Sequence, residues 1–192
     1  MRPPVRGEAR RSALLEATIQ LIGRDGLGAV THRSVAALAG VPAATTSYYF
    51  PSKERLVEEA LRTLGERELA DLRRRHDLLG SADLETTADA LATWLLDHVA
   101  EDGGAAVLAE HELQLEAARR PERRARAAVA REIDALAERA LADLGASDPP
   151  LAALLLISAI DGLELRLLAG DTRLAQQGTL REAIAGLLRA LT

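Results

Sequence analysis

The sequence contains no cysteine, one methionine, one tryptophan, one phenylalanine, two tyrosines and a single lysine among its 192 residues. Without cysteine, disulfides and thiolate metal sites are excluded, and nothing favours an oxidising compartment. No apolar run reaches the length of a membrane-spanning helix, and residues 1–7 lack the apolar segment of a signal peptide. We therefore expect a soluble, cytoplasmic protein without membrane contact.

The charge is unevenly distributed along the chain. The net charge is −5, yet residues 1–55 hold eight Lys or Arg and four Asp or Glu, so this part carries +4 and the remainder −9. A basic N-terminal part on an acidic remainder indicates that only the N-terminal part meets a polyanion.

Apolar residues recur at helical spacing along nearly the whole chain, and no stretch shows the alternation of a β-strand. We predict an all-α fold, with a smaller part in residues 1–55 and a larger helical bundle in residues 56–192. Glycine, proline and capping residues mark the helix ends, and residues 179–182 fit a capping box. The predicted helices cover approximately residues 8–24, 31–39, 43–49, 52–75, 82–100, 105–119, 121–144, 149–169 and 179–191.

Residues 31–50 have the pattern of a helix-turn-helix. Val35, Leu38 and Val41 are spaced to pack two short helices together, and Gly40 permits the tight turn between them.

The second of these short helices has the composition of a DNA-reading helix. Its small and hydroxyl-bearing side chains suit a major groove, where methyl groups contact thymine and hydroxyls reach base edges or phosphates: Ala43, Thr45, Thr46 and Ser47. Tyr48, Tyr49 and Phe50 follow directly. We expect Phe50 in the core and at most one tyrosine fully buried.

This segment resembles the signature of the tetracycline-repressor (TetR) family of bacterial transcriptional regulators. The matching residues within 10–58 are Thr31, Arg33, Val35, Ala36, Ala39, Gly40, Val41, Thr45, Tyr49, Phe50, Ser52, Lys53, Glu54 and Leu56. The resemblance implies about nine helices, a homodimer, and double-stranded operator DNA as partner. It also implies a helix-turn-helix DNA-binding domain in residues 1–55 and a variable ligand-binding and dimerisation domain in residues 56–192. Ala44 departs from the glycine more common at its position.

The resemblance also implies the roles of single residues in the head. Those implied to face bases are Arg33, Ala43, Ala44, Thr45, Ser47 and Tyr48, and those implied to hold phosphates are Thr31, His32, Thr45, Tyr49 and Lys53. Lys53 has an independent reason, because a cation beside the free amides of a helix start suits a phosphate.

The helix that starts at Pro149 is apolar on nearly all sides, so it must be buried on nearly all sides. One stripe contains Leu154, Ser158, Asp161 and Leu165, and the other contains Leu156, Ile160, Leu163 and Leu167. One stripe can face the core and the other a second copy, and which is which stays open. The competing interpretation is a helix fully buried inside a monomer. Our assignment of the dimer surface is Leu156, Ile160, Leu163, Leu167, Ile184, Leu187, Leu188 and Leu191.

A mainly apolar small-molecule site is expected in the helical body. Trp94 and His98 lie one helical turn apart, and Asp161 is a carboxylate in an apolar run that needs a partner. The candidate ligand contacts are Leu91, Trp94, Leu95, His98, His111, Gln114 and Asp161. The competing interpretations are a core tryptophan beside a satisfied histidine, and a body that only dimerises and binds no ligand.

An enzyme is the rival class, and the sequence disfavours it. Residues 111–115 begin like a zinc-protease motif, but Leu115 occupies the second ligand position. A serine nucleophile elbow is also missing. We therefore expect no metal, no cofactor and no catalytic residues.

Overall fold

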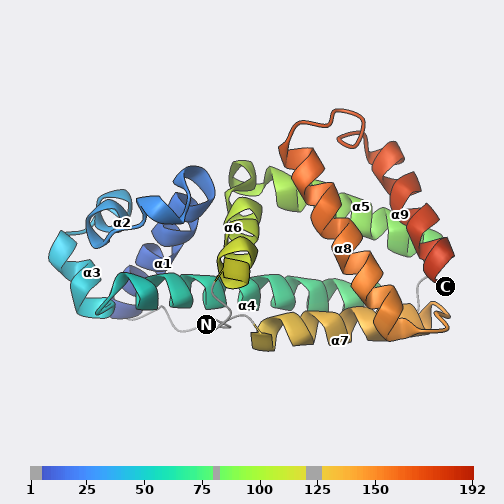
Figure 1. The fold of residues 1–192 in the computed structure, drawn as a ribbon, viewed down its shortest axis with the longest axis horizontal. Coiled ribbons are helices and arrows are strands. Elements are labelled where there is room, and N and C mark those ends of the chain that lie inside the picture. Colours follow the sequence, from blue (N-terminus) through green and yellow to red (C-terminus); the bar gives the residue numbers. More distant parts are fainter. Residues whose placement is uncertain (1–5, 80–82, 120–126) are drawn as a thin grey trace. The chain divides into compact units, whose positions relative to one another are not determined.

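The computed structural model describes residues 6–79, 83–119 and 127–192, whose regular structure is entirely helical (Figure 1). The helices are α1 (Arg6–Asp25), α2 (His32–Leu38), α3 (Ala43–Tyr49), α4 (Lys53–Leu79), α5 (Leu84–Ala100), α6 (Ala105–Arg119), α7 (Ala127–Asp143), α8 (Pro149–Leu168) and α9 (Gln177–Leu191). Two short 3₁₀ helices, η1 (Leu27–Ala29) and η2 (Glu101–Gly104), precede α2 and α6. The all-α prediction is confirmed.

The helix ends follow the predicted local signals in most places. Ser52 Oγ accepts a hydrogen bond from the amide of Arg55 at 3.2 Å, as expected for the residue that caps α4. The capping box predicted at residues 179–182 is wrong, because α9 already begins at Gln177 and Thr179 lies inside its first turn. The predicted start of the seventh helix at residue 121 falls outside the described residues.

The described chain divides into two compact units. The first lies within residues 1–67 and 105–127, and the second within residues 68–104 and 128–192. The division falls within α4 between residues 67 and 68, later in that helix than the predicted boundary at residues 55/56, and α6 joins the first unit.

Helix α6 joins the first unit because α1 offers it a glycine. A Cβ atom on Gly23 would lie 1.9 Å from the carbonyl oxygen of Ala105, so the two backbones can approach this closely only without that atom. Ala109 of α6 is fully buried in the same core.

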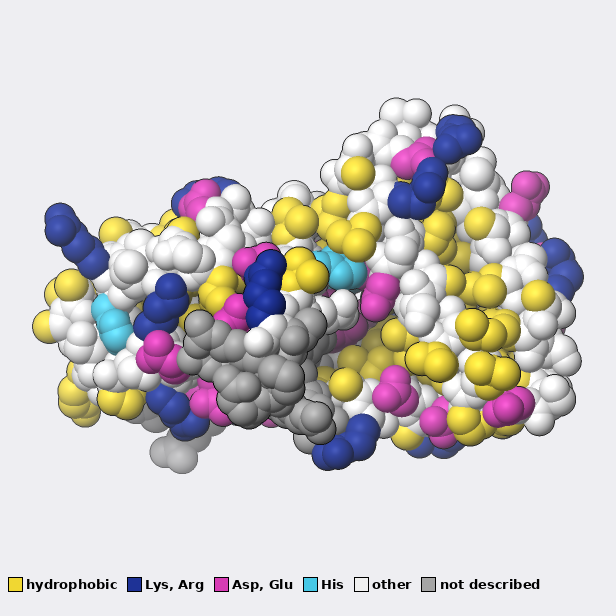
Figure 2. Space-filling model, viewed as in Figure 1, with side chains coloured by type: hydrophobic (Ala, Val, Ile, Leu, Met, Phe, Trp, Pro, Cys, Tyr) yellow, Lys and Arg dark blue, Asp and Glu magenta, His cyan; other side chains and the backbone are white. Residues whose placement is uncertain are grey.

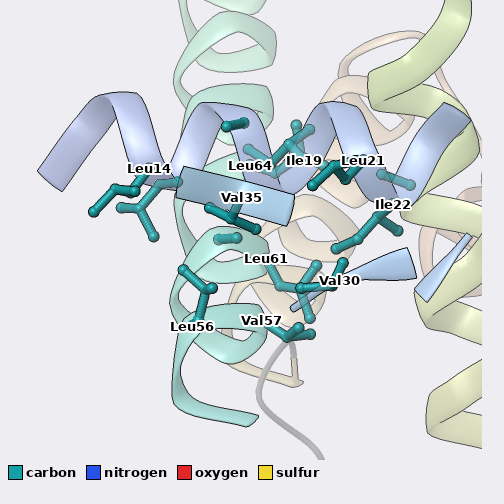
Figure 3. Close-up of a cluster of buried hydrophobic side chains, with 14 of the residues drawn as sticks. Leu14, Ile19, Leu21, Ile22, Val30, Val35, Leu56, Val57, Leu61 and Leu64 are labelled. Atoms are coloured by element: carbon teal, nitrogen blue, oxygen red, sulfur yellow. The ribbon is translucent and has the colours of Figure 1, made fainter. Parts of the chain in front are cut away.

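The core of the first unit is aliphatic apart from Phe50. Figure 3 shows aliphatic members of this core. Leu14, Ile22, Val35, Phe50 and Leu56 are all essentially inaccessible to solvent and come from α1, α2, the end of α3 and α4. Each fully buried side chain of this size contributes about 1.5–3 kcal/mol of hydrophobic stabilisation, and the shared core fixes α2 and α3 against α1 and α4.

The second unit is built around α5, which packs on α8 and α9. Leu95, Ile184 and Leu188 are fully buried there, together with Leu141 of α7. On the surface Glu85 of α5 accepts hydrogen bonds from two arginines of α9, at 2.7 Å and 2.5 Å. Among the residues described, no helix is both long and apolar enough to cross a membrane.

Candidate nucleic-acid interface

Helix α2 starts at a reciprocal capping box. The Thr31 hydroxyl accepts a hydrogen bond from the amide of Ser34 at 3.0 Å, while the Thr31 amide donates to the Ser34 hydroxyl at 2.9 Å. These bonds satisfy two donors that a helix start otherwise leaves free. The Ser34 hydroxyl also donates to the carbonyl of Ala29 at 2.8 Å, which ties α2 to the end of η1.

The turn between α2 and α3 depends on a glycine, as predicted. Gly40 has φ +65°, a left-handed conformation that side chains with a Cβ atom rarely adopt. The amide of Val41 donates to the carbonyl of Ala36 at 3.0 Å and closes the end of α2. Helix α3 therefore leaves the turn in a fixed direction.

Helix α3 presents the predicted small side chains on an open face. Ala43, Ala44 and Ser47 are exposed, and the Tyr48 ring is 82% exposed. The expectation for Thr46 is wrong, because its side chain is fully buried and cannot reach a groove. Neighbouring residues of a helix with 3.6 residues per turn point in different directions, and at Thr46 this direction is toward the core.

The three aromatic residues are arranged as predicted. Phe50 is fully buried, and Tyr49 is half-buried against the core of the first unit. The Tyr48 and Tyr49 rings meet edge to face with centroids 5.1 Å apart. The buried Phe50 ring thus anchors the end of α3, while the Tyr48 ring stays available to a partner.

The residues expected to hold phosphates divide into two groups. The side chain of Thr31 is exposed, and those of Thr45 and Tyr49 are half-buried. By contrast, His32 Nε2 donates to the carbonyl of Phe50 and Lys53 Nζ donates to the carbonyl of Leu27, each at 2.9 Å. The lysine ammonium keeps two further N–H donors, so a phosphate contact by Lys53 stays a prediction.

The ligand candidates of the second unit lie around a stacked aromatic pair. The Trp94 and His98 rings are nearly parallel, 16° apart, with centroids 5.1 Å apart. Trp94 is buried, and His98 Nε2 is a buried atom without a hydrogen-bond partner among the described residues. Leu95 is fully buried and Leu91 is half-buried against the same core.

The remaining ligand candidates are spread over both units. Asp161 is half-buried on α8 of the second unit. His111 and Gln114 belong to α6 in the first unit, where His111 is buried and Gln114 is exposed. A common site for all seven candidates stays a prediction. Within the described residues, no three His, Asp or Glu side chains cluster as metal ligands would.

The dimer assignment needs correction. Ile184 and Leu188 are fully buried in the protomer's own core, so neither can reach a partner. The residues that are half-buried and pack against that core are Leu156, Ile160, Leu163, Leu167 and Leu191, and Leu187 is also half-buried. The inward stripe of α8 is therefore the one that we had assigned to the partner.

The opposite side of α8 carries the exposed leucines. Leu151, Leu154, Leu155 and Leu165 are between 46% and 62% exposed. Figure 2 shows hydrophobic side chains gathered over α8 and the adjacent α9. The sequence contains Leu154 and Leu165 in the rival stripe, but periodicity alone could not show which stripe faces inward.

This architecture defines an all-α protein with a helix-turn-helix head. A family model described as "Bacterial regulatory proteins, tetR family" matches residues 14–60, and one described as "Tetracyclin repressor-like, C-terminal domain" matches residues 82–191. The second match covers more than half of the chain. The chain therefore belongs to the TetR family, a family of DNA-binding transcriptional regulators.

Several solved structures are similar over nearly the whole chain. A TetR-family member from Streptomyces coelicolor A3 is 32% identical, with a TM-score of 0.71 and coverage of 93% of this chain and 97% of that one. The multidrug binding protein EbrR, solved with ethidium, is 33% identical, with a TM-score of 0.67 and the same coverage. EbrR has also been solved with proflavin and malachite green.

Curated relatives match over the head. The HTH-type transcriptional regulator BetI of Agrobacterium fabrum is 45% identical over 65 residues, which is 34% of this chain and 30% of that protein. The matched segment thus spans less than a third of that relative's length.

Proposed function

We propose that this protein is a transcriptional repressor that binds a palindromic operator as a homodimer and leaves it when a small molecule binds the second unit. The observation that carries the DNA-binding part is the open face of α3. There Ala43, Ala44, Ser47 and Tyr48 are exposed, while Thr46 and Phe50 anchor the opposite side in the core. A regulator of this kind works where the chromosome lies, so we expect it in the cytoplasm.

The open face of α3 suits direct reading of base edges. A major groove about 12 Å wide admits one α-helix, and small side chains allow its backbone to come close to the bases. Methyl groups of alanine contact thymine methyls, and the hydroxyls of Ser47 and Tyr48 can donate or accept hydrogen bonds. Arg33, exposed on α2, adds a side chain long enough for a guanine contact.

Selection from a random-sequence DNA library tests operator binding. The wild-type protein should enrich a duplex with inverted half-sites, and its affinity for that duplex should fall steeply with salt. Lys53→Gln should flatten the plot of log affinity against log salt by about 0.9 if the ammonium holds one phosphate. Failure to enrich any sequence, or binding that does not depend on salt, contradicts the proposal.

A matched pair of arginine variants tests the placement of the interface. Arg33→Gln should weaken binding of the selected duplex about 5- to 150-fold, which corresponds to the loss of about 1–3 kcal/mol for one bidentate base contact. Arg131→Gln removes the same charge from an exposed position of α7 and should leave affinity within about twofold. Equal losses in both variants would place the interface elsewhere.

The exposed leucines of α8 support the homodimer. Leu151, Leu154, Leu155 and Leu165 each keep about half of their surface in contact with solvent, and burying half of a leucine contributes about 1 kcal/mol. A two-fold axis through this face would bury the same four leucines in each of the two copies. A dimer of this symmetry also matches an operator with inverted half-sites.

Sedimentation of two leucine variants tests this surface. Leu154→Glu should yield monomers at micromolar concentration, because it places a charge within the buried face. Leu78→Glu, at an 86% exposed leucine at the end of α4, should sediment like the wild type. A wild-type monomer at micromolar concentration contradicts the homodimer, and a dimeric Leu154→Glu variant contradicts this choice of face.

The stacked pair in the second unit supports the ligand response. EbrR binds the planar dyes ethidium and proflavin, and planar aromatic molecules stack favourably on rings such as Trp94 and His98. The buried His98 Nε2 could exchange a hydrogen bond with a polar group of such a ligand. We place the ligand contacts at these two residues, with Leu91 beside them.

Fluorescence provides the test because Trp94 is the only tryptophan. Ethidium or proflavin should quench its emission at concentrations that also release the selected duplex, and Trp94→Ala should raise the concentration needed for release. Release of the duplex with unchanged Trp94 emission would show that the ligand binds away from Trp94. If neither dye releases the duplex and neither quenches, the rival interpretation of a purely dimerising body gains support.

A further inference from the structure

We propose that His32 positions the recognition helix α3 by holding the backbone carbonyl of Phe50, and that it does not hold a DNA phosphate. This inference rests on the proposed DNA binding by α3. It assigns to His32 a role different from the one that the family resemblance implies.

The Phe50 carbonyl lies at a point where the chain leaves helical geometry. Phe50 is the C-terminal cap of α3, with extended backbone angles of φ −131° and ψ 109°, and its own amide donates to the Thr46 carbonyl at 2.8 Å. A carbonyl at the end of a helix needs a donor from elsewhere, because the last turn leaves it unpaired.

His32 supplies that donor. Its Nε2 lies 2.9 Å from the Phe50 oxygen, across 18 residues of sequence. A carbonyl oxygen can only accept, so Nε2 carries the hydrogen of this bond, which excludes the neutral ring with its hydrogen on Nδ1 alone. In the neutral ring Nδ1 then presents a lone pair, which repels rather than binds a phosphate oxygen.

The bond joins the start of α2 to the end of α3. His32 is the first residue of α2, directly after the Thr31 cap, so its backbone is fixed before its side chain reaches out. Gly40 sets the beginning of α3, and the His32–Phe50 bond sets its end. Both ends of the recognition helix are thus tied to α2.

A second interaction holds the side chain of Phe50. The Arg11 guanidinium of α1 lies over the Phe50 ring, 5.4 Å from its centroid, and also pairs with Glu59 of α4. Cation–π contacts of this kind favour one placement of the ring. The end of α3 is therefore held through Phe50 by α1, α2 and α4, and His32 is the contact that acts on the backbone.

The test compares two variants of His32 on the duplex that the wild-type protein enriches from a random library. His32→Ala should bind about tenfold more weakly, equal to about 1.4 kcal/mol, because the carbonyl loses its donor and α3 loses its fixed end. The slope of log affinity against log salt should stay unchanged, since no phosphate contact is lost. His32→Gln, whose amide can donate, should recover binding to within about threefold of the wild type.

His76→Ala is the matched control, because it makes the same change on α4 outside the head and should leave affinity unaltered. A slope that falls by about 0.9 in His32→Ala shows a direct phosphate contact and overturns the proposal. So does a His32→Gln variant that is folded but as weak as His32→Ala.

Nitrogen NMR of the wild-type protein tests the bond without relying on a variant that folds. The His32 ring, assigned by comparison with the His32→Gln spectrum, should show Nε2–H before and after addition of the selected duplex. An Nδ1–H form in either state overturns the proposal. If the wild type enriches no duplex, the proposed function fails, while the ring nitrogens of the free protein still decide whether the His32–Phe50 bond exists.

Discussion

Replacing Gly23 by alanine should destabilise the first unit, although alanine is the better helix former. The added Cβ atom would lie 1.9 Å from the Ala105 oxygen, 2.6 Å from its carbonyl carbon and 2.7 Å from its Cα atom. Ordinary contacts begin near 3.4 Å, and all three atoms belong to the backbone, so α6 must shift by more than 1 Å. Such overpacking costs about 1–3 kcal/mol.

The helix preference of alanine opposes this cost by up to about 1 kcal/mol. The clash falls on rigid backbone, so we expect the upper part of the range and a net loss of about 1–2 kcal/mol. For a chain of this length the melting temperature should fall by about 2–8 °C. The assay is thermal unfolding followed by circular dichroism at one protein concentration.

Gly178→Ala is the matched control, because Gly178 also lies in a helix and a Cβ atom there would meet nothing within 4 Å. This variant should be as stable as the wild type or slightly more stable. The reasoning about α1 and α6 is refuted if Gly23→Ala melts no lower than Gly178→Ala.

Two further predictions concern the N-terminal cap of α2 and the response to acid. Thr31→Ala should cost about 1 kcal/mol because α2 loses its N-terminal cap, and Thr31→Ser should keep that stability in the same melting assay. Asp171 accepts hydrogen bonds from Arg166 and Arg173, which lower the pKa of its carboxyl well below the ordinary range. Its stabilising effect is therefore present above about pH 4 and is lost as the pH falls towards the folded-state pKa. Asp171→Asn should melt below the wild type at pH 7, with a difference that shrinks at pH 3; a constant difference would contradict this linkage.

The short helices of the head could be predicted from the sequence because their ends depend on neighbouring residues. Thr31 caps α2, Gly40 supplies the left-handed turn, and Pro51 follows the end of α3. These signals act within four residues, so no knowledge of the fold is needed. The same kind of signal misled at residues 179–182, where α9 starts one half-turn earlier without a side-chain cap.

The joining of α6 to the head could not be predicted in this way. It depends on Gly23 meeting Ala105, two residues more than 80 positions apart. A glycine within an otherwise regular helix is the only local sign, and by itself it does not name the partner. The hydrogen-bond acceptors of His32 and Lys53 could not be predicted from the sequence either. Both acceptors are backbone carbonyls, which every residue type carries.

Helix α8 shows why an all-round apolar helix leaves its own orientation undecided. Both of its stripes contain leucine, so hydrophobic periodicity is satisfied whichever stripe turns inward. The choice is made by α5 and α9, which cover the side of Ile160 and Leu163 and leave Leu154 and Leu165 outside. An exposed row of leucines on a helix is costly in water, which supports the proposal that the outer stripe faces a second copy. Leu154→Glu is therefore the variant that tests the proposed dimer surface, whereas Ile160→Glu would place a charge against the protomer's own core.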